Sequence, residues 1–384
     1  MTTNSFGLNP FSLDLLHDYS ERPSLPLSDE TTKTLRRLIS ILDNFQIDHQ
    51  AITVLKGPAV SLYKVQLANE SQTVLTSELE DLIAISLGRK GVRVLTSTYS
   101  MDIEIPNVRQ GVVPLKSILN SYQFKEAQKG LPIALGVTAT NDPYVIDLAE
   151  LSHLLVTGAI GMGKSIALHT MIASLLYCRR PDEIKFVLID PKQVEFSLYY
   201  RLKDSYLAKM PGIDEPVISD TAKTIKCLKW LCCEMDRRYS IMQHDGVTHF
   251  KDCKADPLPH IIVLIDEIYN LLKTDGTIEK FIIRLAKKGS SAGIHVIIAS
   301  KYSPSEVISS RLKSCFNSRI SFRTNTEQDS MYTIGSPDAC HLLGRGDSLI
   351  TRPGLSLTRV QCASIEFDEI NLLTKRLADY WQNS

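Results

Sequence analysis

The stretch from Leu154 to Ser165 constrains the fold of this chain more strongly than any other part of its sequence. A short apolar run of strand type leads into a glycine-rich loop that ends in Lys164 and Ser165, and apolar residues then recur at helical spacing. The loop fits the pattern G-x-x-x-x-G-K-[ST], whose glycines let successive backbone N–H groups converge on phosphate oxygens. A glycine-rich turn without a ligand is the alternative, but the strand-loop-helix context favours a nucleoside triphosphate site.

The pattern assigns separate roles to the last two residues of this loop. Lys164 is expected to reach the β- and γ-phosphates, and the Ser165 hydroxyl is expected to hold Mg²⁺. We therefore predict ATP and Mg²⁺ as cofactors. The predicted nucleotide-binding residues of the loop are Gly158, Ala159, Ile160, Gly161, Met162, Gly163, Lys164, Ser165 and Ile166.

The apolar run from Ile261 to Ile265 ends in Asp266 and Glu267 and predicts the second half of the site. A buried strand that ends in an aspartate can place its carboxylate beside the phosphate loop, where Asp266 would join Ser165 as a Mg²⁺ ligand. Glu267 would polarise the water that attacks the γ-phosphate. A pair of solvated acids at a strand end is the alternative. The predicted catalytic residues are Lys164, Asp266 and Glu267.

Three segments with different patterns follow one another along the chain. Residues 1–28 are polar and punctuated by prolines, which predicts an arm. Residues 29–125 combine two helix signals with alternating strands and predict a small α+β domain. Residues 126–384 begin with a linker-like section containing Pro132 and Pro143, and then alternate apolar strands with amphipathic helices. This second pattern predicts an α/β domain with a mostly parallel sheet covered by helices on both faces.

The overall composition limits the possible functions. The 43 basic and 43 acidic residues balance, so a nucleic-acid site would have to be local, as in the lining of a channel. The 8 cysteines include no C-x-x-C pair, which fits free thiols in a reducing compartment. No apolar run approaches the ~18 residues of a membrane span, and the N-terminus does not read as a signal peptide. We therefore expect a cytoplasmic protein without a direct membrane span.

Further motifs resemble the motor of the FtsK/SpoIIIE family of DNA translocases. Beside the phosphate loop and the strand before Asp266, they are Ser152–Val156, Ile189–Lys192, Glu234–Tyr239, Ala292–His295, Arg319–Phe322 and Leu342–Asp347. The resemblance covers nearly the whole chain, because Ile103–Asn107 is similar to the smaller ring-forming domain that precedes the motor. The family implies a RecA-like P-loop ATPase that forms a homohexameric ring around double-stranded DNA, in chromosome partition or DNA transfer. With neither membrane helices nor a C-terminal winged-helix domain expected, the chain resembles the soluble motor alone.

Two positions near the expected nucleotide depart from the family pattern. The family carries an arginine shortly before the Ala-Gly-Ile-His motif that reaches the neighbouring subunit's nucleotide, and this chain has Ser290 there. Arg284, Lys287 or Lys288 could substitute, although a lysine does not reproduce the guanidinium fork. Lys301 replaces a glutamine that would sense the γ-phosphate. It is a candidate nucleotide-binding residue, with an ordinary loop lysine as the alternative.

In the family the DNA-facing loops usually carry basic residues, whereas in this chain they carry basic, acidic and neutral residues. Arg311 and Lys313 match a basic pore-loop position and are the predicted DNA contacts, with a solvated helix face as the alternative. The second loop, residues 324–331, carries acidic and neutral residues. Because each neutralised phosphate adds affinity through counterion release, this composition weakens the expected binding of DNA.

The leading hypothesis from the sequence is an ATP-dependent double-stranded DNA translocase that works as a homohexamer. The alternative is a nucleotide-switched assembly or scaffold protein of the same fold, which would hydrolyse ATP slowly because it lacks the usual arginine finger. A motor of a protein secretion system is less favoured, since neither membrane helices nor tandem motor domains are expected. A small-molecule kinase is least favoured, since no lid segment is recognisable.

Overall fold

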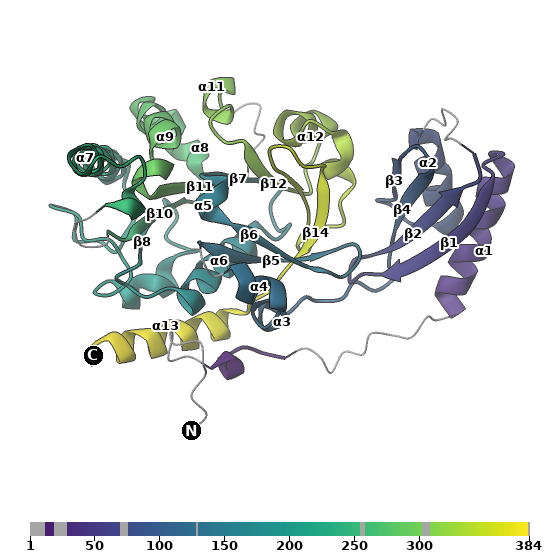
Figure 1. Ribbon diagram of the computed structural model, residues 1–384, viewed down its shortest axis with the longest axis horizontal. Coiled ribbons are helices and arrows are strands. Elements are labelled where there is room, and N and C mark those ends of the chain that lie inside the picture. Colours follow the sequence, from purple (N-terminus) through teal and green to yellow (C-terminus); the bar gives the residue numbers. More distant parts are fainter. Residues whose placement is uncertain are drawn as a thin grey trace.

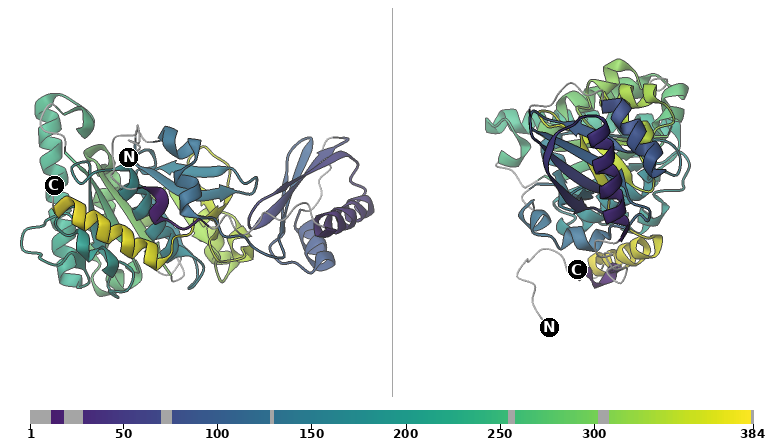
Figure 2. Two further views of the ribbon diagram at one scale, coloured as in Figure 1. Left: turned by 90° about the horizontal axis from the view of Figure 1, so that it is seen from below. Right: turned by 90° about the vertical axis from the view of Figure 1, so that its right-hand side faces the viewer.

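Two β-sheets organise the chain. The computed structural model, shown in Figure 1, describes residues 12–18, 29–69, 76–127, 130–253, 258–301 and 308–382. A four-stranded sheet lies toward the N-terminus, and a ten-stranded sheet follows it. The small sheet and its helices project from one end of the large domain, which makes the molecule elongated (Figure 2).

Alternating apolar residues build the small sheet. Its antiparallel strands follow the order β1 (His49–Lys56), β2 (Val60–Leu67), β4 (Ser100–Pro106) and β3 (Arg93–Thr96). Helices α1 (Asp29–Asn44) and α2 (Thr76–Leu87) pack against one face of this sheet (Figure 1). Leu38 of α1, Ile83 of α2 and Val65 of β2 share one buried core. The helices and strands expected from the sequence are present in this unit.

The large sheet has a parallel centre and an antiparallel edge. Its strands follow the order β6 (Pro143–Asp147), β5 (Pro132–Thr138), β14 (Thr358–Cys362), β13 (Asp347–Thr351), β12 (Ser318–Phe322), β7 (Leu154–Thr157), β11 (Ile294–Ser300), β10 (His260–Ile265), β8 (Ile184–Ile189) and β9 (Val217–Ile218). Pairing is parallel from β12 to β9 and antiparallel from β6 to β12. The mostly parallel sheet predicted from the sequence is confirmed.

Helices cover both faces of this sheet because its central strands are apolar on both sides. In β10, Ile262 and Leu264 join one core and Val263 and Ile265 join the other, as the two-residue period of a strand requires. The first face is covered by α6 (Lys164–Cys178) and α13 (Phe367–Gln382), and the second by α7 (Thr221–Asp245), α8 (Ile268–Thr274) and α9 (Thr277–Lys288).

Shorter helical segments complete the two domains. They are η1 (Leu13–Leu15), α3 (Leu115–Leu119), α4 (Tyr122–Glu126), α5 (Leu148–Leu151), η4 (Ser197–Leu202), η5 (Phe250–Asp252), η6 (Ser290–Ala292), α11 (Ser310–Lys313), α12 (Glu327–Ile334) and η7 (Pro337–His341). Among the described residues, no helix combines the length and the apolar character needed to cross a membrane.

The expectation of a linker before the phosphate loop is wrong, because residues 132–147 contribute strands β5 and β6 to the large sheet. Pro132 and Pro143, which suggested a linker, are the first residues of these strands, where a missing N–H group is tolerated. The packing also departs from the expected domain boundary at residue 125. Leu115, Ile118 and Phe124 lie in the core of the large domain, so α3 and α4 belong to that domain.

Much of the arm expected over residues 1–28 lies outside the described residues. Within residues 12–18, Leu16 is buried in the large core, and the His17 backbone N–H donates to Glu369 of α13 at 2.6 Å. This part of the arm therefore docks beside the last helix, as Figure 1 shows.

A buried charged cluster joins the two domains. Arg359 of β14 lies 2.7 Å from Asp347 of β13 and 3.1 Å from Glu104 of β4, and all three side chains are buried. Burial disfavours the charge on Arg359, but the two carboxylates outweigh this effect and raise its pKa. Arg93 of β3 makes a second link, 2.7 Å from Asp338 of η7. The small domain is thus attached to the large one through one buried charged cluster and a second, partly exposed ion pair.

Candidate nucleotide-binding site

The phosphate loop connects the C-terminal end of β7 to the first turn of α6, as predicted. Gly163 has a φ of 117°, and a Cβ at this position would lie 2.7 Å from the backbone N of Gly346. A Cβ on Gly158 would lie 2.7 Å from Cβ of Phe322. The Gly346 N–H also donates to the Met162 carbonyl at 3.0 Å. The backbone before β13 therefore supports the loop from one side.

Lys164 is buried in the first turn of α6 and folds back over the loop. Its Nζ donates to the carbonyl oxygens of Gly158 and Ala159, each at 2.5 Å. Burial, and then the nearby charge of Lys301, lower the pKa of Lys164 to about 8. An anionic phosphate bound in the loop would therefore stabilise the charged form of Lys164.

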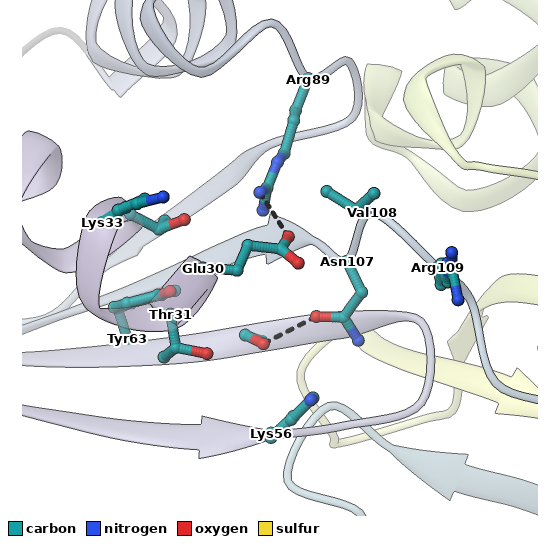
Figure 3. A pocket seen from close by; sticks show the side chains of 11 residues that line it. Glu30, Thr31, Lys33, Lys56, Tyr63, Arg89, Asn107, Val108 and Arg109 are labelled. Carbon is teal, nitrogen blue, oxygen red and sulfur yellow. Dashed lines mark hydrogen bonds and ion pairs between the residues drawn. The ribbon is translucent and has the colours of Figure 1, made fainter. Parts of the chain in front are cut away.

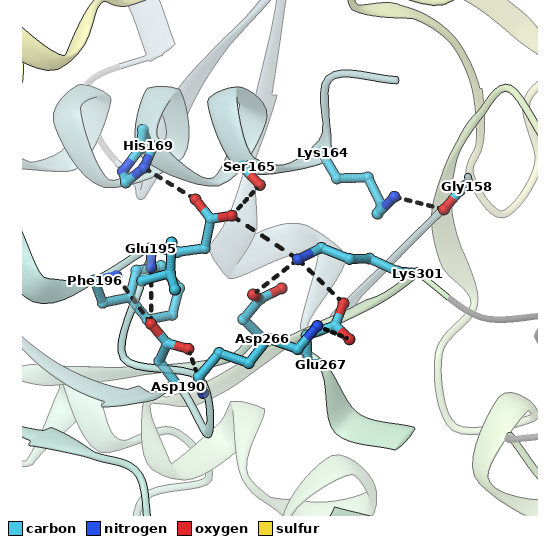
Figure 4. Close-up of polar contacts among 12 residues, drawn as sticks. Gly158, Lys164, Ser165, His169, Asp190, Glu195, Phe196, Asp266, Glu267 and Lys301 are labelled. Carbon is cyan, nitrogen blue, oxygen red and sulfur yellow. Dashed lines mark hydrogen bonds and ion pairs between the residues drawn. The ribbon is translucent and has the colours of Figure 1, made fainter. Parts of the chain in front are cut away.

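Asp266 and Glu267 follow β10. Because β7, β11 and β10 run parallel, the two acids lie at the same edge of the sheet as the phosphate loop (Figure 4). Both side chains are buried, and burial raises the pKa of Asp266 to about 6, although Lys301 opposes this shift. Glu267 has a φ of 52°, a left-handed conformation that costs energy in a residue with a Cβ and recurs at functional sites. The structure thus brings the predicted acids together with the loop.

The structure adds an acid that sequence reasoning missed. Glu195 accepts a hydrogen bond from Ser165 Oγ at 2.6 Å and lies 3.7 Å from Nε2 of His169 (Figure 4). The neighbouring His169 ring and then the hydrogen bond from Ser165 hold the pKa of Glu195 below its usual range. A third carboxylate therefore faces the nucleotide site in its charged form.

The Asp190 side chain stabilises the loop that carries Glu195. Its buried carboxylate accepts backbone N–H groups from Lys192 at 3.1 Å, from Glu195 at 2.9 Å and from Phe196 at 3.2 Å. The Asp190-Pro191-Lys192 motif was visible in the sequence as a strand end followed by a turn. An acid five residues after Asp190 was the only signal that could have indicated Glu195.

Ser165, Glu195 and Asp266 present oxygen atoms to one another across this site (Figure 4). Hydroxyl and carboxylate oxygens are the donors that Mg²⁺ accepts, usually together with water and substrate phosphates. Asp266 Oδ2 has no hydrogen-bond partner among the described residues, and its ion-pair partner Lys301 is 3.9 Å away. The donor set therefore fits a hard divalent cation beside bound phosphates.

Lys301 follows β11 and lies among these acids. Its Nζ is 3.3 Å from Glu267 and 3.9 Å from both Asp266 and Glu195. Burial opposes the charge on Lys301, but the carboxylates of Asp266 and Glu267 outweigh it and raise its pKa. Lys192 lies 3.3 Å from the other oxygen of Glu267. Lys301 is therefore part of the site, while its contact with a phosphate stays a prediction.

The predicted DNA contacts lie at the opposite edge of the sheet. They belong to α11, which precedes β12, and β12 runs parallel to β7. Arg311 is exposed, whereas Nζ of Lys313 lies 4.0 Å from the centre of the Tyr332 ring, and burial lowers the pKa of Lys313. The second loop enters α12, where Thr326 accepts the Asp329 backbone N–H at 3.1 Å. DNA contacts by Arg311 and Lys313 stay predictions.

Ser290 and its possible substitutes lie at that opposite edge too. Ser290 is in η6, directly before β11, whereas Lys301 follows β11 at the other end. Arg284 is engaged with Asp236 at 2.7 Å, and Lys287 is exposed near the end of α9. Lys288 follows it and is exposed as well. These side chains therefore stand apart from the phosphate loop of their own chain.

The small domain has a hollow of about 570 Å³, lined by α1, β2 and the chain after β4 (Figure 3). Arg89 donates to Glu30 at 2.7 Å, and Ser61 donates to Asn107 at 2.7 Å. These contacts pair polar groups of the wall with one another. None of the site residues predicted from the sequence lies among the described residues of this wall.

Comparison with known proteins finds relatives along nearly the whole chain. The sequence profile of the FtsK/SpoIIIE family matches residues 114–257, and that of the FtsK alpha domain matches residues 11–107. DNA translocase FtsK of Chlorobaculum tepidum is 34% identical over an alignment of 376 positions, which covers 95% of this chain and 47% of that protein. DNA translocase FtsK of Haemophilus influenzae is 32% identical over an alignment of 406 positions, which covers 97% of this chain and 74% of that protein. The chain thus spans about half the length of the first of these relatives.

Solved structures share the fold. The pCW3 conjugation coupling protein TcpA, in a monomer form with ATPγS, has a TM-score of 0.61 and 19% identity, over 91% of this chain and 99% of that one. The cytoplasmic domain of the type VII secretion ATPase EccC of Thermomonospora curvata has a TM-score of 0.58 and 20% identity, over 70% of this chain and 34% of that one. Both likenesses concern the fold, which is that of P-loop ATPases.

Proposed function

The chain belongs to the FtsK/SpoIIIE family, and we propose that it hydrolyses ATP to move along double-stranded DNA as a homohexamer. One observation carries the ATPase part of this proposal. Lys164 and Ser165 of the phosphate loop meet Asp266, Glu267 and Glu195 at a single edge of the large sheet. Chromosome partition and DNA transfer are the processes that such a motor would serve.

The residues around the phosphates divide the chemistry among them. Bound Mg²⁺ would neutralise charge on the β- and γ-phosphates. Ser165 and Asp266 are its proposed ligands, and Glu195 orients the Ser165 hydroxyl through their 2.6 Å hydrogen bond. Lys164 holds the same phosphate oxygens with its ammonium group.

Glu267 is the proposed base that accepts a proton from the attacking water. In this structure Lys192 and Lys301 neutralise both of its oxygens, each at 3.3 Å. These two ion pairs occupy the oxygens that would otherwise contact the attacking water. Movement of Lys301 toward the phosphates would free the Glu267 oxygen that it contacts, and would thus couple the base to the arrival of substrate.

Arg311 and Lys313 are the proposed contacts to the DNA backbone. Arg311 is exposed and free to reach a phosphate, whereas Lys313 packs on Tyr332. We therefore assign the larger share of the contact to Arg311. A log-log salt slope of DNA affinity that stays near zero would contradict backbone contacts.

A second function is favoured by Ser290, which stands where an arginine finger is expected. Without a guanidinium in this place, hydrolysis would be slow, because a finger can contribute ~10³- to 10⁵-fold in rate. The chain would then act as a nucleotide-switched assembly protein. It would form rings with ATP but ignore DNA.

ATP turnover across a range of protein concentrations, with and without linear duplex DNA, separates the two functions. Lys164→Ala serves as the blank. A cooperative rise with protein concentration and strong stimulation by DNA support the motor. Binding of ATP with slow turnover that does not respond to DNA supports the assembly protein. If Glu267→Gln hydrolyses ATP as fast as the wild type, the assignment of the base is wrong.

A further inference from the structure

Three side chains with metal-binding atoms lie together outside the nucleotide site. Glu327 is the first residue of α12, and Cys340 and His341 are the last two residues of η7. A carboxylate oxygen of Glu327, the Sγ atom of Cys340 and an imidazole nitrogen of His341 all lie within 4.8 Å of one another. The group therefore joins the second of the two expected DNA-facing loops, residues 324–331, to the segment before β13.

All three side chains are accessible to an ion from solvent. Glu327 and His341 are exposed, and Cys340 is half-buried with a free thiol. Zinc binds sulfur at about 2.3 Å and nitrogen or oxygen at about 2.0–2.2 Å, so the ligand atoms of a tetrahedral site stand roughly 3.3–3.8 Å apart. Rotation of exposed side chains is enough to bring the three atoms to this spacing.

Hydrogen bonds hold the backbone of η7 against the second loop. The Ala339 N–H donates to Ser330 Oγ at 2.9 Å, and the Ala339 carbonyl accepts the Thr324 N–H at 3.1 Å. Ala339 directly precedes Cys340, and Thr324 and Ser330 stand on either side of Glu327 in the sequence. The backbone therefore keeps these two ligand residues close before an ion arrives, which reduces the ordering needed on binding.

The donor set selects among metal ions. Mg²⁺ and Ca²⁺ take oxygen ligands, whereas Zn²⁺ accepts a thiolate, an imidazole and a carboxylate together. Two acids, Glu327 and Asp338, and one cation, Arg323, are among the charges that act on Cys340. This balance favours a bound cation. Three protein ligands leave a fourth tetrahedral position for water.

We propose that Glu327, Cys340 and His341 bind Zn²⁺, with water as the fourth ligand. Cys340 releases its thiol proton to solvent on binding, so one thiolate and one carboxylate balance the two charges of the ion. The ion ties the start of α12 to the end of η7 and offsets the charge of Glu327. The consequence for DNA rests on the proposed function, in which the second loop faces DNA: the loop becomes less repulsive to phosphates.

Titration with Co²⁺ and Zn²⁺ tests the site without nucleotide or DNA. Co²⁺ bound to a thiolate absorbs light, and none of the proposed metal-binding residues of the nucleotide site is a cysteine. The wild-type chain is expected to show this absorption with one Co²⁺ per chain, and Zn²⁺ is expected to displace it.

The ligand variants are expected to lose metal. Cys340→Ser should abolish the absorption and weaken Zn²⁺ binding at least roughly a hundredfold, because even the loss of a residue that supports a metal ligand costs about 10- to 100-fold. Glu327→Gln and His341→Gln should each weaken Zn²⁺ binding at least about tenfold. Since the altered side chains are not buried, the metal-free variants are expected to melt at the temperature of the metal-free wild type.

Cys253→Ser is the matched control. Cys253 is a half-buried free thiol like Cys340, and His249 stands four positions before it, but neither belongs to a group of three such ligands among the described residues. This variant is expected to keep the absorption and the Zn²⁺ affinity of the wild type. Cys340→His replaces the thiol by another zinc ligand, and is expected to bind Zn²⁺ without the thiolate absorption.

The effect on the second loop is measured as affinity for duplex DNA with and without Zn²⁺. Zn²⁺ is expected to strengthen DNA binding by the wild type roughly two- to fivefold, the size of one exposed charge interaction, and to leave Cys340→Ser unchanged. If Zn²⁺ binds but changes DNA affinity equally in both proteins, the part of the proposal that concerns the loop is wrong.

The metal site itself is overturned if the wild type gives no thiolate absorption, or if Cys340→Ser and Cys253→Ser bind Zn²⁺ alike. Failure of the proposed function looks different. In that case the chain does not bind duplex DNA at any concentration of Zn²⁺, while the Co²⁺ titration still reports on the site.

Discussion

Arg359 and Glu104 meet across the boundary between the two domains, with Nη1 of the arginine 3.1 Å from Oε2 of the glutamate. Asp347 holds the other side of the same guanidinium at 2.7 Å. Arg359→Met is expected to lower the free energy of unfolding by about 3–5 kcal/mol, because it leaves two buried carboxylates without a cation. Denaturant-induced unfolding followed by fluorescence and circular dichroism measures this loss.

Arg284→Met is the matched control for this substitution. Arg284 pairs with Asp236 at a similar distance of 2.7 Å, but both side chains are about half exposed. Its loss is expected to cost less than about 1 kcal/mol, because water screens the pair. Equal losses of unfolding free energy in the two variants would show that the buried cluster stabilises the fold no more than an exposed ion pair does.

Lys301→Gln is expected to weaken the binding of ATP without Mg²⁺ by roughly tenfold, equivalent to about 1.4 kcal/mol. Removing this ammonium leaves the neighbouring carboxylates to repel the phosphates. Binding of a fluorescent ATP analogue in the presence of a chelator measures the effect. Lys226→Gln, an exposed lysine of α7, is the control. Unchanged affinity in Lys301→Gln would remove Lys301 from the nucleotide site.

Glu195→Gln is expected to raise the Mg²⁺ concentration needed for half-maximal turnover by roughly ten- to a hundredfold. The amide still accepts the hydrogen bond from Ser165, but the negative charge that favours a cation is lost. Turnover at saturating ATP is measured over a series of Mg²⁺ concentrations, with the exposed Glu78→Gln as control. A shift in the maximal rate alone would contradict a role near the metal.

His295 is expected to make the fold sensitive to acid. Its Nδ1 faces the Ser152 carbonyl at 2.9 Å and its Nε2 faces Nδ1 of His260 at 3.0 Å. Burial lowers the pKa of His295 from 6.5 to about 4. Between these two pKa values the unfolded chain binds a proton on His295 and the folded chain does not. The free energy of unfolding present at pH 7 is therefore lost as the pH falls from about 6.5 toward 4.

Thermal unfolding at pH 7 and pH 5 tests this expectation in the wild type and in His295→Asn. Asparagine can still donate to the Ser152 carbonyl but does not titrate. The wild type is expected to lose more of its melting temperature between the two pH values than the variant does. Parallel losses would assign the acid sensitivity to other groups.

The parts of the site that the sequence predicted depend on local pattern. The phosphate loop needs glycines and a Lys-Ser pair at fixed spacing, and Asp266 needs only a buried strand that ends beside it. Parallel strands then bring the two together without further information. These elements were predictable because backbone geometry alone decides where they meet.

The missed parts depend on side-chain contacts between distant segments. Glu195 enters the site because Asp190 captures three backbone N–H groups of the loop that carries it. Nothing in the spacing of apolar residues reports such a turn. Pro132 and Pro143 led to the wrong prediction of a linker, because prolines occur in linkers and also as the first residue of a strand.

The cluster at the domain boundary also has a mechanical meaning. Asp347, which holds Arg359, directly follows Gly346, whose N–H donates to Met162 in the phosphate loop at 3.0 Å. A load that pulls the small domain away acts first on the buried pair with Glu104 and then on the backbone beside the loop. A load on the small domain would therefore reach the nucleotide site through two neighbouring residues, Asp347 and Gly346.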